Sequence, residues 1–204
     1  MDVVHLGDAE IRILPVVRGL PSETGPVIQA FGAPGLDASA LSVSPEDLEK
    51  LRHFRGTPIE PENVEDEVYM AGLSAWEEPV MPPPCFVEAV RQCATRGIPL
   101  EALDFGEEEY ADAYASCVSA LELIRQGRME MKLSKMRFNV HTPEQFVLAW
   151  DAEVNRPAGF AALQHRREQH IAVRLSEIAA RARHVLAIIE VERARGVVAA
   201  LHGT

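Results

Sequence analysis

The chain has 204 residues, of which 47% are hydrophobic and 25% are charged, and its formal net charge is −11 at pH 7. This size and composition are typical of a globular domain that buries a substantial core. The acidic balance, without a Lys/Arg-rich face, argues against a nucleic-acid partner, because phosphate backbones would be repelled.

Two further properties of the sequence concern the compartment. Cys85, Cys93 and Cys117 have no paired spacing and lie among apolar residues, so we expect buried free thiols in a reducing environment. The first residues lack the basic segment and long apolar run of a signal peptide. No stretch approaches the roughly 18 uninterrupted apolar residues of a membrane span. We therefore predict a cytoplasmic protein that does not bind membranes.

The predicted strands begin at the N-terminus. Residues 2–6 and 10–17 are β-rich, and the intervening Gly7-Asp-Ala9 is typical of a hairpin. Further strands are predicted at residues 39–43, 98–103 and 184–191.

Helical segments separate and follow these strands. Ser44-Pro-Glu-Asp47 and Thr142-Pro-Glu144 each combine an N-cap residue with proline and acids in the first turn, which is a helix start signal. Gly97 suits the left-handed position that ends a helix. The predicted helices cover residues 23–31, 45–54, 61–76, 86–95, 107–126, 129–138, 146–154, 160–183 and 196–201.

The alternation of strands and helices indicates the α/β class. We expect a mixed, mostly parallel sheet of about four to six strands flanked by helices, with a helical insertion near residues 106–155. The sequence contains no internal repeat or low-complexity segment. We therefore predict one α/β domain over residues 1–204.

Two arginines lie on the apolar face of the long predicted helix near the C-terminus. At 100° per residue, Arg167 and Arg174 share the stripe that should face the core, and His170 lies near its edge. Arginine cannot lose its charge, so burial requires a partner. The arginines either pair with carboxylates such as Glu190 or Glu192, or extend past the apolar surface, or bind an anion in a cleft.

Charged residues also follow the predicted strands. Because the carboxyl ends of parallel strands meet at one edge of a sheet, where ligands often bind, we expect these residues to form a cluster. The cluster comprises Arg18, Glu23, Asp104, Glu190, Glu192 and Arg193. Glu190 and Glu192 would share one face of the last strand, since side chains alternate along it. Such acids could perform acid–base chemistry, hold a divalent cation, or simply neutralise the arginines.

Motifs that would name a reaction are missing from the sequence. It has no glycine-rich phosphate loop, dinucleotide fingerprint, nucleophile elbow or Cys-x-x-Cys pair. His165 and His170 are five residues apart, which misses the four-residue spacing that directs two ligands to one side of a helix. The cofactor therefore stays unknown at the level of sequence.

Short motifs in the second half of the chain occur in a familiar order. Arg167-Glu168 precedes the apolar Ile171-Ala-Val-Arg-Leu175, and Val185-Leu-Ala-Ile-Ile189 precedes Gly196-Val-Val. This order resembles the C-terminal end of the TraB/PrgY family, and residues 86–104 are similar to its central helix–strand unit. The resemblance implies a mixed α/β core with a site at the strand ends. It also implies a clan that includes Tiki-type metalloproteases, erythromycin-esterase-like hydrolases and haem-binding ChaN-like proteins.

The chain departs from that family at both of its histidine motifs. Where the family carries Gly-x-x-His after the first core strand, this chain reads Arg18-Gly-Leu-Pro21. Where the family carries Gly-x-Gly-His after the last strand, it reads Glu190-Val-Glu192-Arg193. Only Arg167 and Glu168 carry over residue by residue, so the resemblance does not imply a histidine-ligated metal here.

Three hypotheses for function follow. The first is a divergent TraB-like protein that binds a small anionic molecule or a protein partner, with Arg167 and Arg174 holding the anion and Glu190 and Glu192 orienting it. The second is a metal-assisted hydrolase with a carboxylate-rich site for a divalent cation. The third is a structural or assembly protein that forms a homo-oligomer and uses the charged cluster as a scaffold.

Overall fold

A computed structural model describes residues 1–57, 64–124, 136 and 138–203, and in this part of the chain five strands form one sheet. Its order is β1-β2-β5-β3-β4, with β1 antiparallel to β2 and the other neighbours parallel. The strands are β1 (Asp2–Leu6), β2 (Ala9–Val16), β3 (Ala38–Leu41), β4 (Leu100–Ala102) and β5 (His184–Glu190). The predicted α/β class and mixed, mostly parallel sheet are confirmed.

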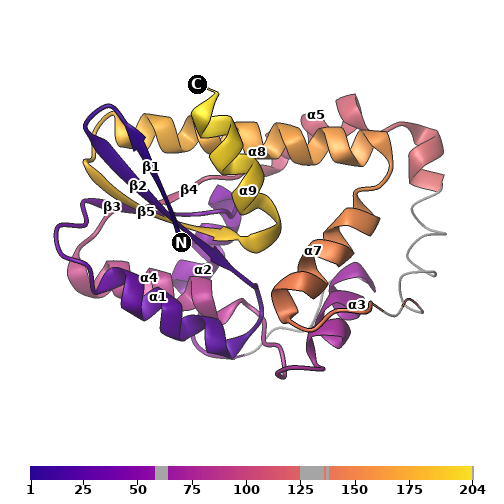
Figure 1. Cartoon of the computed structure of the whole chain (residues 1–204), viewed down its shortest axis with the longest axis horizontal. Helices are drawn as coiled ribbons and strands as arrows, with labels where there is room; N and C mark the ends of the chain where they lie inside the picture. Colours follow the sequence, from indigo (N-terminus) through magenta and orange to yellow (C-terminus); the bar gives the residue numbers. More distant parts are fainter. Residues whose placement is uncertain (58–63, 125–135, 137, 204) are drawn as a thin grey trace.

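Helices cover both faces of the sheet (Figure 1). One layer contains α1 (Thr24–Phe31), α2 (Pro45–His53) and α4 (Pro84–Arg96). The opposite layer contains α8 (Ala158–Ala179) and α9 (Val191–His202).

The central strand β5 contributes to both cores. Ala187 and Ile189 pack with Leu175 of α8, whereas Leu186 and Ile188 pack in the opposite cluster. Successive side chains of a strand point to opposite faces, so a strand that is covered on both sides must be apolar at every position. This explains the uninterrupted hydrophobic run of the sequence.

Three more helices lie beside the sheet: α3 (Val64–Leu73), α5 (Glu107–Cys117) and α7 (Pro143–Val154) (Figure 1). In α3, Gly72 packs so closely on α7 that an added Cβ would lie 2.0 Å from Cζ of Phe146. The ring of Phe146 in turn packs against Trp150 and Tyr69. None of the described helices is long and apolar enough to cross a membrane.

The helix start and end signals predicted from the sequence form helix caps in the structure. Ser44 Oγ accepts a hydrogen bond from the Asp47 backbone N at 3.0 Å, and Thr142 Oγ1 accepts one from Gln145 N at 3.2 Å. Gly97 ends α4 in the left-handed region, at φ 66°. These caps are local interactions, which is why the sequence alone predicts them.

Some predicted boundaries are wrong. The helix predicted over residues 107–126 is interrupted. Its first part, α5, ends at Cys117 because Val118 is extended, and residues 120–124 form a second helical segment that Ser119 caps by donating its backbone N and Oγ to Glu122. The helix predicted over residues 160–183 ends at Ala179. The last strand stops at Glu190 and α9 begins at once, so the final helix is longer than predicted.

Two predictions fall on parts of the chain that the structure does not describe. The helix predicted at residues 129–138 lies almost wholly outside the described residues. The start of the helix predicted at 61–76 also lies outside them, and α3 is described from Val64 to Leu73.

Candidate functional site

The carboxyl ends of the parallel strands open onto a cleft. Arg18 follows β2, Ser42 follows β3, Asp104 follows β4 and Glu190 ends β5, and all four residues line it. The cleft has an outer lobe of about 470 Å³ and an inner lobe of about 250 Å³. The two lobes share Arg18, Asp66, Tyr110, Arg167 and Glu190.

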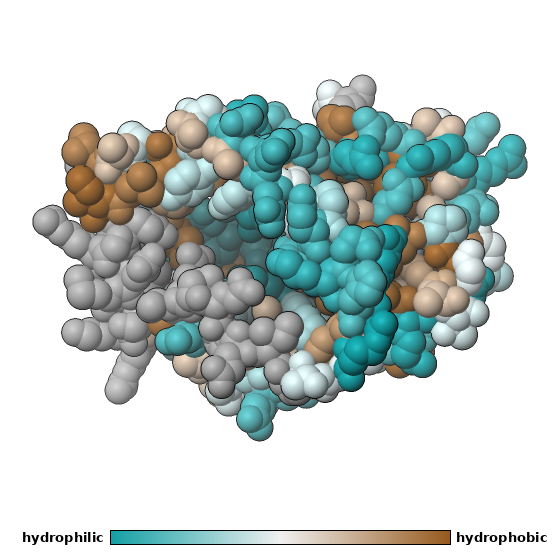
Figure 2. All heavy atoms as spheres, turned by 180° about the vertical axis from the view of Figure 1, so that it is seen from behind, coloured by the Kyte–Doolittle hydropathy of each residue, from teal (hydrophilic) through white to brown (hydrophobic). Residues whose placement is uncertain are grey.

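The outer lobe lies between α2, the segment before α4 and the start of α5. Figure 2, which views the molecule from behind, shows a hollow near the middle of this face. Apolar side chains form much of the wall, including Val43, Leu51, Phe54, Met81, Phe86 and Phe105. Lys50 and Asp47 form an exposed ion pair of 2.9 Å at this lobe. The lobe therefore offers an apolar surface beside a charged rim.

The inner lobe is strongly charged and is built from α3, α7, α8, α9 and the strand ends. Three arginines line it: Arg18, Arg167 and Arg193. Four carboxylates line it as well: Asp66, Asp151, Glu190 and Glu192. Of the residues predicted for the site, the structure brings Arg18, Arg167, Glu190, Glu192 and Arg193 to this lobe.

Asp104 and Arg167 form the most complete ion pair of the cleft. Arg167 Nε donates to both carboxylate oxygens of Asp104 at 3.1 Å, and Nη2 donates to Oδ2. Burial opposes both charges, but the paired hydrogen bonds outweigh it, so the pKa of Asp104 is lowered and the pKa of Arg167 is raised. Both groups are therefore ionised and mutually satisfied.

Gln164 connects this pair to a second one. Its Oε1 accepts from Nη1 of Arg167 and from Nη1 of Arg193. Arg193 Nε also donates to Glu190 Oε2 at 3.2 Å, and the Glu190 backbone N donates to Ser42 Oγ at 3.1 Å. A single amide thus holds two guanidinium groups in place along one wall of the inner lobe.

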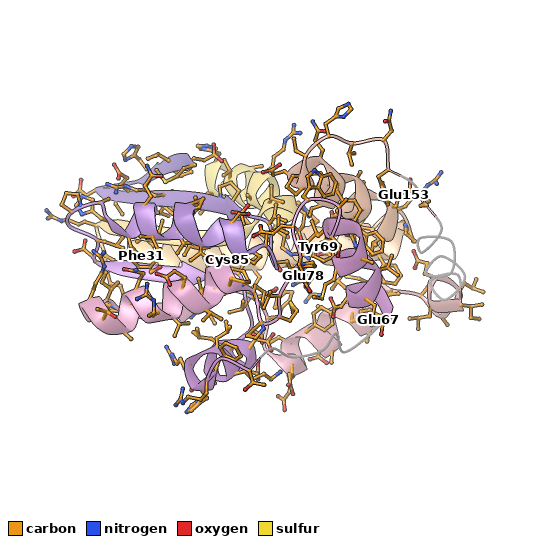
Figure 3. The ribbon with its side chains drawn as sticks, turned by 90° about the horizontal axis from the view of Figure 1, so that it is seen from below. Phe31, Glu67, Tyr69, Glu78, Cys85 and Glu153 are labelled. Carbon is orange, nitrogen blue, oxygen red and sulfur yellow. The ribbon has the colours of Figure 1, made fainter. Side chains whose placement is uncertain are left out.

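Arg18 is different because one of its donors lacks an acceptor. Its Nε is buried and makes no hydrogen bond to any part of the protein that the structure describes. The guanidinium stacks 4.6 Å from the ring centre of Tyr69 and lies 3.7 Å from Asp66 Oδ1. Tyr69 lies on the side of α3 that faces the sheet, whereas Glu67 lies on its outer side (Figure 3). Burial disfavours the charge, but nearby carboxylates, chiefly Glu190, outweigh it and raise the pKa of Arg18.

Glu192, like Arg18, lines the inner lobe and has a buried side-chain atom without a partner among the described residues. Its Oε2 is buried and accepts no hydrogen bond from the described residues. Burial raises the pKa of Glu192 to about 7, and the neighbouring Glu190 carboxylate acts in the same direction against the charges of Arg193 and Arg18. A carboxyl with this pKa can hold or release a proton near neutral pH.

The end of α7 adds a further polar group to the inner lobe. Asn155 Nδ2 donates to Asp151 Oδ1 at 2.8 Å, whereas Asn155 Oδ1 is buried without a partner among the described residues. Burial raises the pKa of Asp151. Among the described residues, three that line the inner lobe therefore each carry a buried polar atom without a hydrogen-bond partner: one donor, on Arg18, and two acceptors, on Glu192 and Asn155.

Three of the residues predicted for the site, namely Arg174, His170 and Glu23, do not line either lobe. Arg174 is bonded to Glu177 and lies 3.8 Å from Glu101, so the prediction that it joins Arg167 at the site, or pairs with Glu190 or Glu192, is wrong. His170 stacks on Phe105, with ring centres 4.3 Å apart.

The predicted positions of Glu23, Glu190 and Glu192 also differ from those in the structure. Glu23 is partly buried near the Val17 backbone, and burial raises its pKa, but it does not line either lobe. The prediction that Glu190 and Glu192 share a strand face is wrong, because Glu192 belongs to the first turn of α9. They approach the same lobe from a strand end and a helix start.

Several lining residues were missed by the sequence analysis. They are Asp66, Tyr69, Tyr110, Asp151 and Asn155, which come from α3, α5 and α7 with its C-cap. No functional motif marks these residues in the sequence, and only tertiary packing brings them to the cleft. Gln164 could have been found, because it lies one helical turn before Arg167 and faces the same way.

Metal ligation has no evident residue set in the described part of the chain, where no group of three or more His, Cys, Asp or Glu side chains is placed to hold an ion. The carboxylates of the inner lobe are instead interleaved with arginines. No protein-family model matches the sequence, and no curated protein matches it either.

Proposed function

We propose that the cleft binds a small carboxylate-bearing organic molecule, with the carboxylate at Arg18 and an apolar part in the outer lobe. The observation that carries this proposal is the buried Arg18 Nε, which lacks an acceptor within the described residues. Leaving such a donor unsatisfied costs roughly 1–3 kcal/mol, so a ligand oxygen there gains affinity. Arg167 is less suited to this role, because each of its three nitrogens already donates to Asp104 or Gln164.

The dimensions of the cleft also favour a small ligand. Pockets for small molecules usually enclose about 300–1,000 Å³ and combine apolar walls with a few polar groups. The outer lobe, at about 470 Å³, lies within that range, and Phe54 and Phe86 give it aromatic walls.

The experiment compares ligands and variants by thermal shift and calorimetry. Hexanoate, 3-phenylpropionate and L-phenylalanine are titrated into the protein, with hexanol as a probe that lacks the carboxylate. We expect at least one carboxylate to stabilise the protein, and Arg18→Gln to remove that effect. Arg18→Lys retains a charge but lacks the Nε donor, and we expect it to weaken binding at least tenfold.

A matched control is available at the surface. Arg181 forms an exposed ion pair with Glu101, and neither residue lines the cleft, so Arg181→Gln should bind like the parent protein. If no carboxylate binds, or if Arg18→Gln binds as well as the parent protein, the proposed function is wrong.

A second candidate function is acid–base catalysis on the bound ligand. It is favoured by the position of Glu192, which lines the same lobe as Arg18 and whose buried Oε2 accepts no hydrogen bond from the described residues; burial raises its pKa to about 7. The test follows the ligand by NMR during incubation with the protein. Turnover that Glu192→Gln abolishes even at ligand concentrations that saturate the variant would support catalysis, and an unchanged ligand would leave binding as the function.

The relation to TraB/PrgY proteins stays a proposal. Its support is positional: the two places where that family carries histidines correspond to the segments of Arg18 and Glu192, and both residues line the inner lobe. We infer a divergent relative that retains the site location but has exchanged histidines for an arginine and a carboxylate.

A further inference from the structure

We propose that the ligand of the inner lobe is a free α-amino acid with an apolar side chain, its carboxylate on Arg18 and its ammonium on Glu192 and Asn155. This inference rests on the proposed carboxylate-binding function and adds a second recognition element to it.

Three buried polar atoms carry the inference. Arg18 Nε is a donor, while Glu192 Oε2 and Asn155 Oδ1 are acceptors, and none has a hydrogen-bond partner within the described ranges. All three residues line the inner lobe. A carboxylate accepts hydrogen bonds and an ammonium donates up to three, so a head group that carries both matches one donor and two acceptors.

The orientation of the Asn155 amide is fixed by its neighbour. Its Nδ2 donates to Asp151 Oδ1 at 2.8 Å, and turning the amide over would place two oxygens against each other. The free atom is therefore the oxygen, which requires a donor from the ligand.

The balance of charges in the inner lobe also favours a zwitterionic ligand over a simple carboxylate. Three arginines meet four lining carboxylates there, and Asp104 pairs with one of those arginines from outside the lobe. A simple carboxylate would add negative charge beside Glu190 and Glu192. A zwitterion adds none, because its ammonium offsets its carboxylate, and like charges in a weakly solvated site repel strongly.

The outer lobe then receives the rest of the molecule. It adjoins the inner lobe through Arg18 and Arg167, which line both. Its wall includes Phe54, Phe86 and Phe105, which favour an aliphatic or aromatic side chain over a charged one.

The experiment compares L-phenylalanine with two molecules that share its ring and chain length. One is 3-phenylpropionate, which lacks the ammonium, and the other is phenethylamine, which lacks the carboxylate. Calorimetry with the full chain should show L-phenylalanine binding at least tenfold more tightly than either.

Variants assign the ammonium contact. We expect Glu192→Gln to weaken L-phenylalanine binding at least tenfold while leaving 3-phenylpropionate binding no weaker. Glu168→Gln is the matched control, because Glu168 is also a largely buried glutamate but lies against Gly196, outside both lobes. It should bind both compounds like the parent protein.

The possible outcomes distinguish failure of the amino-acid inference from failure of the proposed carboxylate binding. Equal or tighter binding of 3-phenylpropionate by the parent protein overturns the amino-acid inference and leaves carboxylate binding in place. Failure of every carboxylate to bind overturns both. Should Glu192→Gln fail to fold, as circular dichroism would reveal, the three-ligand comparison on the parent protein still decides the question.

Discussion

The Asp104 carboxylate accepts hydrogen bonds from both Nε and Nη2 of Arg167, and so joins the end of β4 to the middle of α8. The Asp104 side chain is 6% exposed and the Arg167 side chain 16% exposed. The pair therefore stabilises the wall of the cleft, and Arg167 keeps little capacity for a ligand.

Breaking this pair should destabilise the fold. Asp104→Asn leaves a buried arginine without its counter-charge, and removing one partner of a buried pair typically costs about 3–5 kcal/mol. The double variant Asp104→Leu with Arg167→Met should recover much of that loss, as urea denaturation of the full cycle would show. Arg156→Gln, which removes an exposed pair, is the control and should cost less than about 1 kcal/mol. An Asp104→Asn variant as stable as this control would contradict the assignment.

Glu192 should make stability depend on pH. Its pKa is raised from 4.5 in the unfolded chain to about 7 in the folded protein, mainly by burial. The folded state therefore binds the proton of Glu192 more tightly than the unfolded chain does. The resulting contribution to the free energy of unfolding is fully present below pH 4.5 and is lost as the pH rises through 7. The loss amounts to at most about 3 kcal/mol.

Glu192→Gln removes this titration. The difference between the unfolding free energies of the parent protein and the variant should change by about that amount between pH 4.5 and 8. Parallel pH profiles would show that Glu192 ionises normally in the folded protein.

Gly72 should resist substitution. A Cβ there would overlap the Phe146 ring, which is itself buried, so Gly72→Ala must separate α3 from α7 at a cost of roughly 1–3 kcal/mol. Gly25 in α1 has nothing within 4 Å of an added Cβ, and Gly25→Ala should be neutral or stabilise by up to about 1 kcal/mol. Thermal unfolding of both variants tests this contrast, and equal effects would argue against the close packing of α3 on α7.

Gln164 should matter more than its exposed neighbour on the same helix. Gln164→Met removes the acceptor shared by Arg167 and Arg193, and a hydrogen bond to a charged group is worth about 1.5–3 kcal/mol. Gln169→Met removes only an exposed contact with His165, so it should change stability by no more than about 0.5 kcal/mol. Chemical denaturation distinguishes the two, and a silent Gln164→Met would remove the bridging role.

Local physics made the fold class readable from the sequence. The apolar run of β5, the caps at Ser44 and Thr142 and the left-handed Gly97 all depend on interactions within a few residues. The meeting of Arg18, Asp104 and Glu190 was also predictable, because parallel strands bring their carboxyl ends to one edge.

Tertiary structure decided which charges meet. Helical phase places Arg167 and Arg174 on one stripe, but seven residues of α-helix separate them by about 10 Å along the axis. Arg167 therefore reaches Asp104 beyond the end of β4, whereas Arg174 lies near Glu101 within that strand. The periodicity of a helical sequence gives the direction in which each side chain points around the axis. It does not give which residues of other elements lie beside each position along the axis. For that reason the sequence determined the elements and the edge where the site lies. Packing alone selected the donor and the acceptors that have no partner there among the described residues.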